Sequence, residues 1–382
     1  KYRPEFRAFP AEIPSVLGEN GVFEALKGTE RLVAIWSGRD PEVGKALVGL
    51  LERFKAAGSE VRLLIPGEQN NAFGADAMGV RPDRLPGYLA VDGDGKKAAE
   101  EIWRAELPKG PGLDTGAMLK AAASGKLQFL YLAGANLMGT YPDRALVEKA
   151  LDTVPFLVVQ DLFLTETAQY ADVVLPASGF PAKSGRYTSF DGTVQRVEQA
   201  MAPEFQSRPD GEIFAAVAQA VGARIVETAK ELEWEMERLT GWTEGALIPA
   251  APAELTTASA WTRAASAVGA RQAQDGLVLI PVERLFAGGG TAYFDPGVAR
   301  ARPKAEALIH PDDAGALGVD EGDAVTLQSG TASQTYTVRL SGLVMRGTVQ
   351  VAKGLVEAPA NAFGPGAATR VTALKAVAEE VG

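Results

Sequence analysis

The most constraining feature of this sequence is a series of short apolar runs that alternate with segments of helical period between residues 31 and about 221. The runs lack the strict alternation of a half-exposed strand, which indicates parallel strands covered on both faces. They occupy residues 31–36, 61–65, 129–133, 156–159 and 172–175. Strands that alternate with helices predict an α/β domain with a doubly wound, mostly parallel sheet.

The segment between the first two runs predicts one helix over residues 41–57. Apolar side chains recur there at helical spacing, at positions 43, 47, 50, 51 and 54. Asp40 is placed to cap this helix, Pro41 fits its first turn and Gly58 suits its end. Strand, capped helix and strand form a βαβ unit.

The sequence changes character twice outside this pattern. Residues 66–112 are rich in Gly, Pro, Asn and Asp, which predicts long loops over one edge of the sheet. Residues 249–275 open with an Ala-, Thr- and Pro-rich tract and predict a linker or a loosely packed connection. We therefore expect an α/β domain over residues 1–248 and a second domain over residues 276–382.

The second domain is expected to be a compact β-barrel. Its short β-branched runs, LVLIPV, DAVTLQS, QTYTVRL and GTVQVAK, are separated by Gly turns. One short helix interrupts them, with His310 at its cap, Pro311 in its first turn and Gly318 at its exit. No G-x-S-x-G nucleophile elbow occurs, so His310 is interpreted as a structural residue and not as a catalytic base.

Composition excludes several classes of chemistry. The chain has no cysteine and a single histidine, so by itself it cannot build a thiolate nucleophile, a Cys-ligated iron–sulfur cluster or a His-rich metal centre. Its net charge of −10 repels nucleic acids and anionic lipids. No apolar run approaches the roughly 18 residues that span a bilayer, so membrane insertion is not expected. The missing initiator Met suggests a piece of a longer protein.

Ligands of doubly wound sheets bind at the carboxyl ends of the strands. Three segments fall there: residues 37–40, Gly134 to Asn136, and Gln160 with Asp161. Their polar side chains suit a nucleotide, but capping and turn formation explain them equally well. The next segment, Thr165 to Thr167, opens a short helix with a hydroxyl cap followed by the Glu166 carboxylate.

Two glycine-rich loops carry weaker signals. Residues 179–197 contain Lys183, Arg186 and Arg196, which could hold an anion, although exposed loops usually carry such charges for solvation. Gly288 to Gly290 could approach a phosphate, but neither a capped helix nor a Lys accompanies them, so a turn is the favoured interpretation.

Residues 160–176, QDLFLTETAQYADVVLP, resemble a segment shared by the molybdopterin oxidoreductase superfamily. Residues 182–195, AKSGRYTSFDGTVQ, here called the pterin loop, resemble the stretch in which the family usually has an acidic residue, a Lys and then G-T-x-x-N-x-E-G-R-x-Q. Gly185, Gly192 and Gln195 keep their places, whereas other positions depart. Arg186 stands for the Thr, Ser189 for the Asn and Thr193 for the Arg.

Three further segments support the resemblance. LAGANLMGTYPD, residues 132–143, is similar to the family's G-A-N-P segment, and Arg208 to Ile213 is similar to its R-x-D-W-x-I motif. Residues 309–330 resemble the family's C-terminal double-psi barrel. The resemblance implies a pterin-dinucleotide crevice, retained here only in residual form. Its positions are Gly134, Asn136, Gln160, Asp161, Thr165, Glu166, Thr167 and Gly185.

The altered pterin loop on an intact scaffold resembles one branch of that family, the large iron–sulfur subunit of bacterial NADH–quinone oxidoreductase (complex I), in its C-terminal half. The resemblance implies a scaffold without cofactor, catalytic residue or metal ligand of its own. Iron–sulfur clusters would lie in a preceding N-terminal part. Its partners would be other peripheral-arm subunits at the cytoplasmic face of the membrane.

Two alternatives stay open. The chain could be the C-terminal half of an active molybdopterin enzyme such as a formate dehydrogenase, in which the crevice residues contact the pterin dinucleotide. It could also be a nucleotide-binding adaptor module, which would leave the superfamily segment unexplained.

Overall fold

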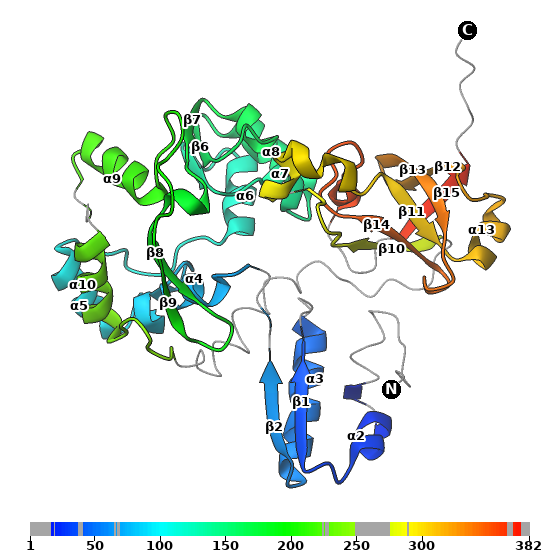
Figure 1. The fold of residues 1–382 in the computed structure, drawn as a ribbon, viewed down its shortest axis with the longest axis horizontal. Coiled ribbons are helices and arrows are strands. Elements are labelled where there is room, and N and C mark those ends of the chain that lie inside the picture. The colour runs from blue at the N-terminus through cyan, green and yellow to red at the C-terminus, as the bar shows by residue number, and fades with distance from the viewer. Residues whose placement is uncertain are drawn as a thin grey trace. The chain divides into compact units, whose positions relative to one another are not determined.

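The computed structural model describes residues 17–18, 20–36, 41–64, 66, 69–223, 225, 229–248, 276–288, 290–364 and 370–375 (Figure 1). The predicted connection over residues 249–275 and the predicted cap at Asp40 lie outside these residues. The chain forms two units, Lys1–Met118 with Leu175–Ser266 and Leu119–Val174 with Ala267–Gly382. Because each unit is discontinuous in the sequence, the boundaries 1–248, 249–275 and 276–382 stay a prediction.

The predicted βαβ unit is present in the first unit. Strands β1 (Arg31–Ile35) and β2 (Glu60–Leu64) pair in parallel, and α3 (Pro41–Ala56) connects them and covers one face (Figure 1). The apolar face of α3 is buried, with Phe54 only 1% exposed. The expectation that both faces of these strands are covered is wrong among the described residues, because Val33 and Ile35 are 62% and 69% exposed.

The segment predicted as long loops contains regular elements instead. Residues 66–112 include α4 (Ala72–Ala77), η2 (Pro86–Tyr88), α5 (Gly95–Trp103) and the short antiparallel pair β3 (Arg84–Leu85) and β4 (Leu89–Ala90). Gly and Pro mark the turns between these elements, and elements this short leave little periodicity in the sequence.

The first unit also holds the pterin loop. Strands β8 (Gly185–Thr188) and β9 (Val194–Val197) form an antiparallel hairpin that contains most of this loop. Helices α9 (Asp210–Ala220) and α10 (Ala229–Thr240) follow in the chain. The side chain of Asn71, just before α4, joins that helix to β8, because its Oδ1 accepts the N–H of Thr188 at 2.9 Å.

The second sheet joins β5 (Leu130–Ala133), β6 (Leu157–Asp161) and β7 (Val173–Pro176), with β5 and β6 parallel. Helices α6 (Thr115–Ala123), α7 (Leu137–Thr140) and α8 (Arg144–Thr153) and the turn η3 (Thr167–Tyr170) accompany it. Residues 157–160 of β6 are all buried, as predicted. Strands β1 and β2 thus form one sheet and β5, β6 and β7 another. The sequence did not predict this division, because apolar runs indicate buried strands without specifying which strands pair.

The predicted C-terminal barrel is confirmed. Six strands close in the order β10-β14-β11-β13-β12-β15, which leaves no unpaired edge in the barrel. They are β10 (Leu277–Val282), β11 (Glu306–Ile309), β12 (Ala324–Ser329), β13 (Ala332–Leu340), β14 (Thr348–Ala352) and β15 (Arg370–Lys375). Fully buried side chains such as Ile309, Leu327 and Tyr336 fill its interior.

His310 and Gly288 both have structural roles. His310 caps α13 (Pro311–Leu317), since its Nδ1 accepts the N–H of Asp312 at 3.1 Å, and Gly318 ends the helix in the left-handed conformation. At Gly288 a Cβ would lie 1.5 Å from the carbonyl oxygen of Gly354. A close approach between two backbone segments therefore requires this glycine, whereas its neighbour Gly289 lies outside the described residues.

Replacing the cap should destabilise the barrel. We expect His310→Ala to lower the free energy of unfolding by about 0.5–2 kcal/mol, because the N–H of Asp312 loses its acceptor. His310→Asn should retain most of the stability, because Asn is itself a favoured cap. Urea unfolding followed by circular dichroism measures both, and equal losses in the two variants would contradict a capping role.

Candidate functional site

Seven of the eight predicted crevice residues lie in the second unit, at the carboxyl ends of β5 and β6. Gly134 follows β5 with φ at +61°, and its N–H donates to the carbonyl of Gln160 at 2.8 Å. Asn136 precedes α7, and residues 165–167 lead into η3. The eighth residue, Gly185, begins β8 in the first unit.

The Asn136 amide is bound within the protein. Its Oδ1 accepts from the Thr167 hydroxyl at 2.8 Å, and the same hydroxyl oxygen accepts the N–H of Met138 at 3.0 Å. Thr167 is completely buried and Met138 is 1% exposed. This chain of hydrogen bonds joins the start of α7 to η3 across the ends of β5 and β6.

The other polar residues of the crevice also have partners in the chain. The Tyr131 hydroxyl donates to Oε1 of the fully buried Gln160 at 2.6 Å. Asp161 Oδ1 accepts the N–H of the next residue at 2.7 Å. The Thr165 hydroxyl, two residues before η3, accepts the N–H of Ala168 at 3.2 Å.

Glu166 forms an ion pair with Arg144 that uses both carboxylate oxygens and both terminal guanidinium nitrogens. The Arg144 and Glu166 side chains are 19% and 21% exposed. The hydrogen bond that Arg144 donates to the Glu166 carboxylate is the main cause that raises the pKa of Arg144, against the opposing effect of burial. Arg144 Nη1 also donates to the carbonyl oxygen of Met138 at 2.9 Å, so the pair fixes α7 as well.

Asn361 contacts this site from the other end of the chain. It lies in η7 (Ala360–Phe363), and its Nδ2 donates to the carbonyl oxygens of Met138 at 3.0 Å and Tyr141 at 2.8 Å. Sequence reasoning missed Asn361, because no local pattern links residues 220 positions apart. We call the set Asn136, Met138, Arg144, Glu166, Thr167 and Asn361 the strand-end cluster.

Aromatic rings pack against one another in the same unit. Phe163 stacks on Phe294 of α12 (Thr291–Phe294), with ring centroids 4.3 Å apart and planes 12° from parallel. The guanidinium of Arg302 lies 4.7 Å from the ring centroid of Tyr293. Two stacked rings at 4.3 Å leave no space for a third ring between them.

The cations of the glycine-rich loop are paired with carboxylates. Lys183 binds Asp210, and Arg196 lies near Glu198 and Glu233. Arg186 Nη2 lies 3.5 Å from carboxylate oxygens of Glu233 and Glu237 on α10. The anion-holding interpretation is therefore not favoured for these three side chains.

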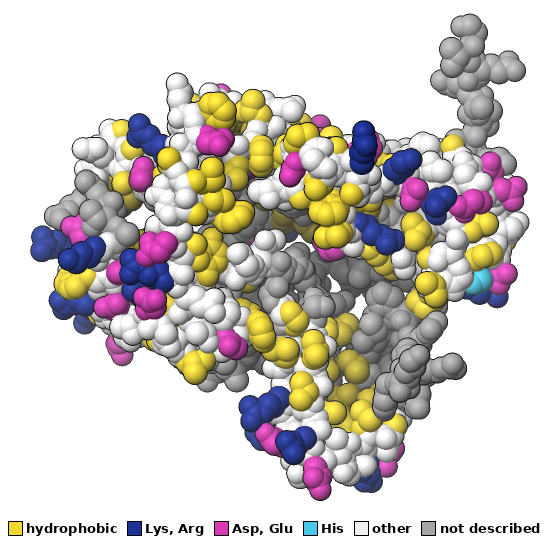
Figure 2. All heavy atoms as spheres, in the orientation of Figure 1, with side chains coloured by type: hydrophobic (Ala, Val, Ile, Leu, Met, Phe, Trp, Pro, Cys, Tyr) yellow, Lys and Arg dark blue, Asp and Glu magenta, His cyan; other side chains and the backbone are white. Residues whose placement is uncertain are grey.

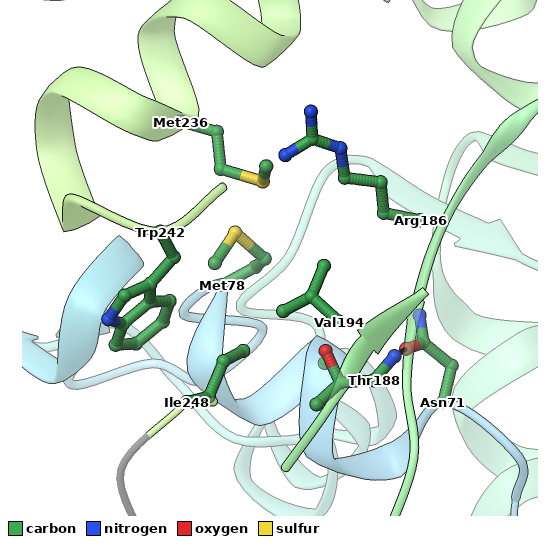
Figure 3. A pocket seen from close by; sticks show the side chains of 9 residues that line it. Asn71, Met78, Arg186, Thr188, Val194, Met236, Trp242 and Ile248 are labelled. Carbon is green, nitrogen blue, oxygen red and sulfur yellow. Dashed lines mark hydrogen bonds between the residues drawn. The ribbon is translucent and has the colours of Figure 1, made fainter. Parts of the chain in front are cut away.

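A small cavity lies beneath the β8–β9 hairpin, among Met78, Met236, Trp242 and Ile248, with Arg186 extending from β8 toward Met236 (Figure 3). Its volume is about 60 Å³. Pockets that bury drug-sized ligands measure roughly 300–1,000 Å³, so this cavity has no room for a dinucleotide.

The described part of the chain offers neither a metal centre nor a membrane span. There, no group of three or more His, Cys, Asp or Glu side chains is arranged to hold a metal ion. None of the described helices is long and apolar enough to span a bilayer. On the face shown in Figure 2, basic and acidic side chains are interspersed.

Curated relatives include three oxidoreductase subunits. An NADH-quinone oxidoreductase subunit of Rhizobium meliloti is 32% identical over 331 residues, which cover 84% of this chain and 39% of the relative. The NADPH-Fe(3+) oxidoreductase alpha subunit of Geobacter sulfurreducens is 29% identical over 91% of this chain and 42% of the relative. The F420-dependent formate dehydrogenase alpha subunit of Methanocaldococcus jannaschii is 43% identical over 155 residues, 40% of this chain and 23% of the relative.

A solved structure shares the fold. Acetylene hydratase from Pelobacter acetylenicus aligns with a TM-score of 0.52 at 17% identity, covering 86% of this chain and 49% of that one. The chain thus spans less than half the length of these relatives. Two family models match it, Molybdopterin oxidoreductase over residues 44–220 and Molydopterin dinucleotide binding domain over residues 277–376. The chain belongs to the molybdopterin oxidoreductase family.

Proposed function

We propose that this chain is the scaffold half of a peripheral-arm subunit of an NADH–quinone oxidoreductase and holds no molybdopterin. The matches to the Rhizobium NADH-quinone oxidoreductase subunit and to the Geobacter NADPH-Fe(3+) oxidoreductase subunit extend over 84% and 91% of the chain, whereas the match to the formate dehydrogenase covers 40%. Of the two long matches, the NADH-quinone oxidoreductase subunit has the higher identity, 32% against 29%. A scaffold that resembles the NADH-quinone oxidoreductase relative along most of its length is the simplest interpretation of this difference.

The observation that carries the proposal is the pairing inside the strand-end cluster. A bound pyrophosphate cofactor needs several donors that converge on it from the strand ends. Here Asn136, Arg144 and Thr167 are bound to other residues of the cluster, and Gln160 receives the Tyr131 hydroxyl. Asn136 and Gln160 accept in these bonds, and the donors Arg144 and Thr167 do not fit a pterin dinucleotide without breaking theirs.

The tip of the pterin loop supports the same conclusion. The Ser189 hydroxyl binds the Asp191 carboxylate, which also accepts the N–H of Thr193 at 3.0 Å. These hydrogen bonds lower the pKa of Asp191, and the bond from the Ser189 hydroxyl has the largest effect. The family pattern has an Arg where Thr193 stands, and Arg is a bidentate donor suited to phosphate. The loop here closes on itself.

Electron transfer from NADH to quinone would run outside this chain. Without cysteine and with a single histidine, the chain offers no cluster ligands of the usual kind. Iron–sulfur clusters would therefore sit in another part of the subunit and in neighbouring subunits. The assembly would lie at the cytoplasmic face of the membrane, with this chain attached through its partners.

A second candidate is the C-terminal half of a formate dehydrogenase. This candidate is supported by the 43% identity over 155 residues, which is higher than the 32% identity to the NADH-quinone oxidoreductase subunit. In that case the strand-end cluster would have to open around a cofactor, and Glu166 and Asn136 would exchange their present partners for it.

Molybdenum content separates the two candidates. We expect the full subunit, purified from its source, to contain molybdenum and pterin far below one equivalent per chain, because Arg144 and Thr167 already donate within the strand-end cluster. Elemental analysis, with fluorescence of acid-oxidised pterin, measures both. A near-stoichiometric signal would make the formate dehydrogenase candidate the better one.

A mutation tests whether Glu166 is structural. Glu166→Gln should lower the free energy of unfolding by about 1–3 kcal/mol, because it leaves the largely buried Arg144 guanidinium without its charged partner. Glu101→Gln removes an exposed carboxylate of α5 and serves as the control, with an expected change within about 0.5 kcal/mol. Equal stability of both variants in urea titrations would favour a ligand-binding role for Glu166.

A further inference from the structure

The connection between β10 and β11 of the barrel reaches the strand ends of the second sheet. It contains α12 and the turn η6 (Pro296–Ala301), and we call residues 291–302 the cover segment (yellow in Figure 1). Phe294 of this segment stacks on Phe163, which follows the last residue of β6 by two positions. The contact therefore places α12 at the end of the sheet where ligands of doubly wound folds bind.

Tyr293 brings the same segment close to the strand-end cluster. Its ring packs edge-on against Phe294, with centroids 5.3 Å apart. Burial is the main cause that raises the pKa of Tyr293, and the carboxylates of Glu357 and Glu166 raise it further against the opposing effect of Arg302. Glu166 is a member of the cluster, so the phenol of the cover segment lies within electrostatic range of it.

The barrel fixes the cover segment on both sides. Before it, the backbone at Gly288 passes so close to Gly354 that neither position has room for a side chain. After it, β11 pairs with β13 and β14. Between these points η6 is closed by Asp295, whose Oδ1 accepts the N–H of Gly297 at 2.7 Å. The segment can thus move away from the sheet while its two ends stay attached to the barrel.

The cover segment is packed less tightly than the residues beneath it. Among the described residues of α12 and η6 none is fully buried, whereas Thr167 is completely buried and Met138 is 1% exposed. Segments with few buried apolar contacts open at a lower free energy than the core to which they are attached, and active-site lids are of this kind. The stack of Phe294 on Phe163 is therefore a main attachment of a weakly held segment to a rigid cluster.

We propose that the cover segment is an autoinhibitory lid, which keeps the strand ends closed through the Phe163–Phe294 stack and opens locally while the barrel stays folded. A planar ligand that stacked on this face of Phe163 would first have to displace Phe294. The inference rests on the proposed function, in which the crevice holds no cofactor, and it adds the element that keeps the crevice closed.

Hydrogen–deuterium exchange of the full subunit, followed by mass spectrometry, tests the lid. In Phe294→Ala we expect the peptides that contain Met138 and Thr167 to exchange at least about fivefold faster, because loss of an aromatic stack populates the locally open state. Peptides of β12 and β13 should exchange as in the wild type, because the barrel does not take part in this opening.

Phe156→Ala is the matched control, because it removes another stacked pair at the opposite end of the same strand. Phe156 precedes β6 and stacks on Phe129, with ring centroids 6.0 Å apart and planes 23° from parallel. This variant should leave the exchange at Met138 and Thr167 unchanged. A rise equal to that of Phe294→Ala would show general loosening of the sheet and would overturn the inference.

Arg302→Gln provides a second, milder variant, in case Phe294→Ala does not fold. It removes the contact of the guanidinium with the Tyr293 ring and should raise exchange in the same two peptides by a smaller factor. Unchanged exchange there, or a rise spread evenly over the barrel, overturns the inference and leaves the proposed function standing. Molybdenum and pterin near one equivalent in the wild-type subunit would contradict the proposed function, and the exchange data would still report whether the segment opens.

Discussion

The peptide groups of Met138 carry the contacts on which the second unit depends. A buried N–H or C=O without a partner costs more than a typical hydrogen bond gains, so each must be satisfied. The N–H of Met138 donates to Thr167, and its carbonyl oxygen accepts from both Arg144 and Asn361. These three side chains come from η3, α8 and η7. One buried residue thus joins the strand ends to the segment that follows β14 of the barrel.

This arrangement limits what the strand ends can do for a ligand. A polar group that fixes α7 is not available to bind a ligand. An N–H that already donates to a backbone oxygen at about 3 Å cannot at the same time donate to a phosphate. Arg144 shows the conflict most clearly. Its guanidinium belongs to the strand-end cluster, yet both of its terminal nitrogens already donate to Glu166 or Met138. Family membership therefore describes the scaffold, and the state of these side chains decides its chemistry.

The features that sequence reasoning predicted correctly are those with a local cause. The helix over 41–56, the strands 31–35 and 130–133, the barrel runs and the His310 cap follow from periodicity and end signals within a few residues. The failures have non-local causes. Nothing near Lys183 or Arg186 indicates that carboxylates of α9 and α10 pair with them, and nothing near Asn361 points to Met138. Strand partners, which divide the parallel strands into two sheets, are likewise set by tertiary packing.

Arg186 joins the β8–β9 hairpin to helix α10. Its side chain is only 12% exposed, and within the described chain its Nε and Nη1 have no hydrogen-bond partner. The charge is compensated instead by Glu233 and Glu237, each 3.5 Å from Nη2. Moving the hairpin away from α10 would separate the guanidinium from both carboxylates, so these ion pairs oppose the movement. The charge that replaces a threonine of the family pattern therefore fixes the loop to a helix and makes its opening toward a ligand unfavourable.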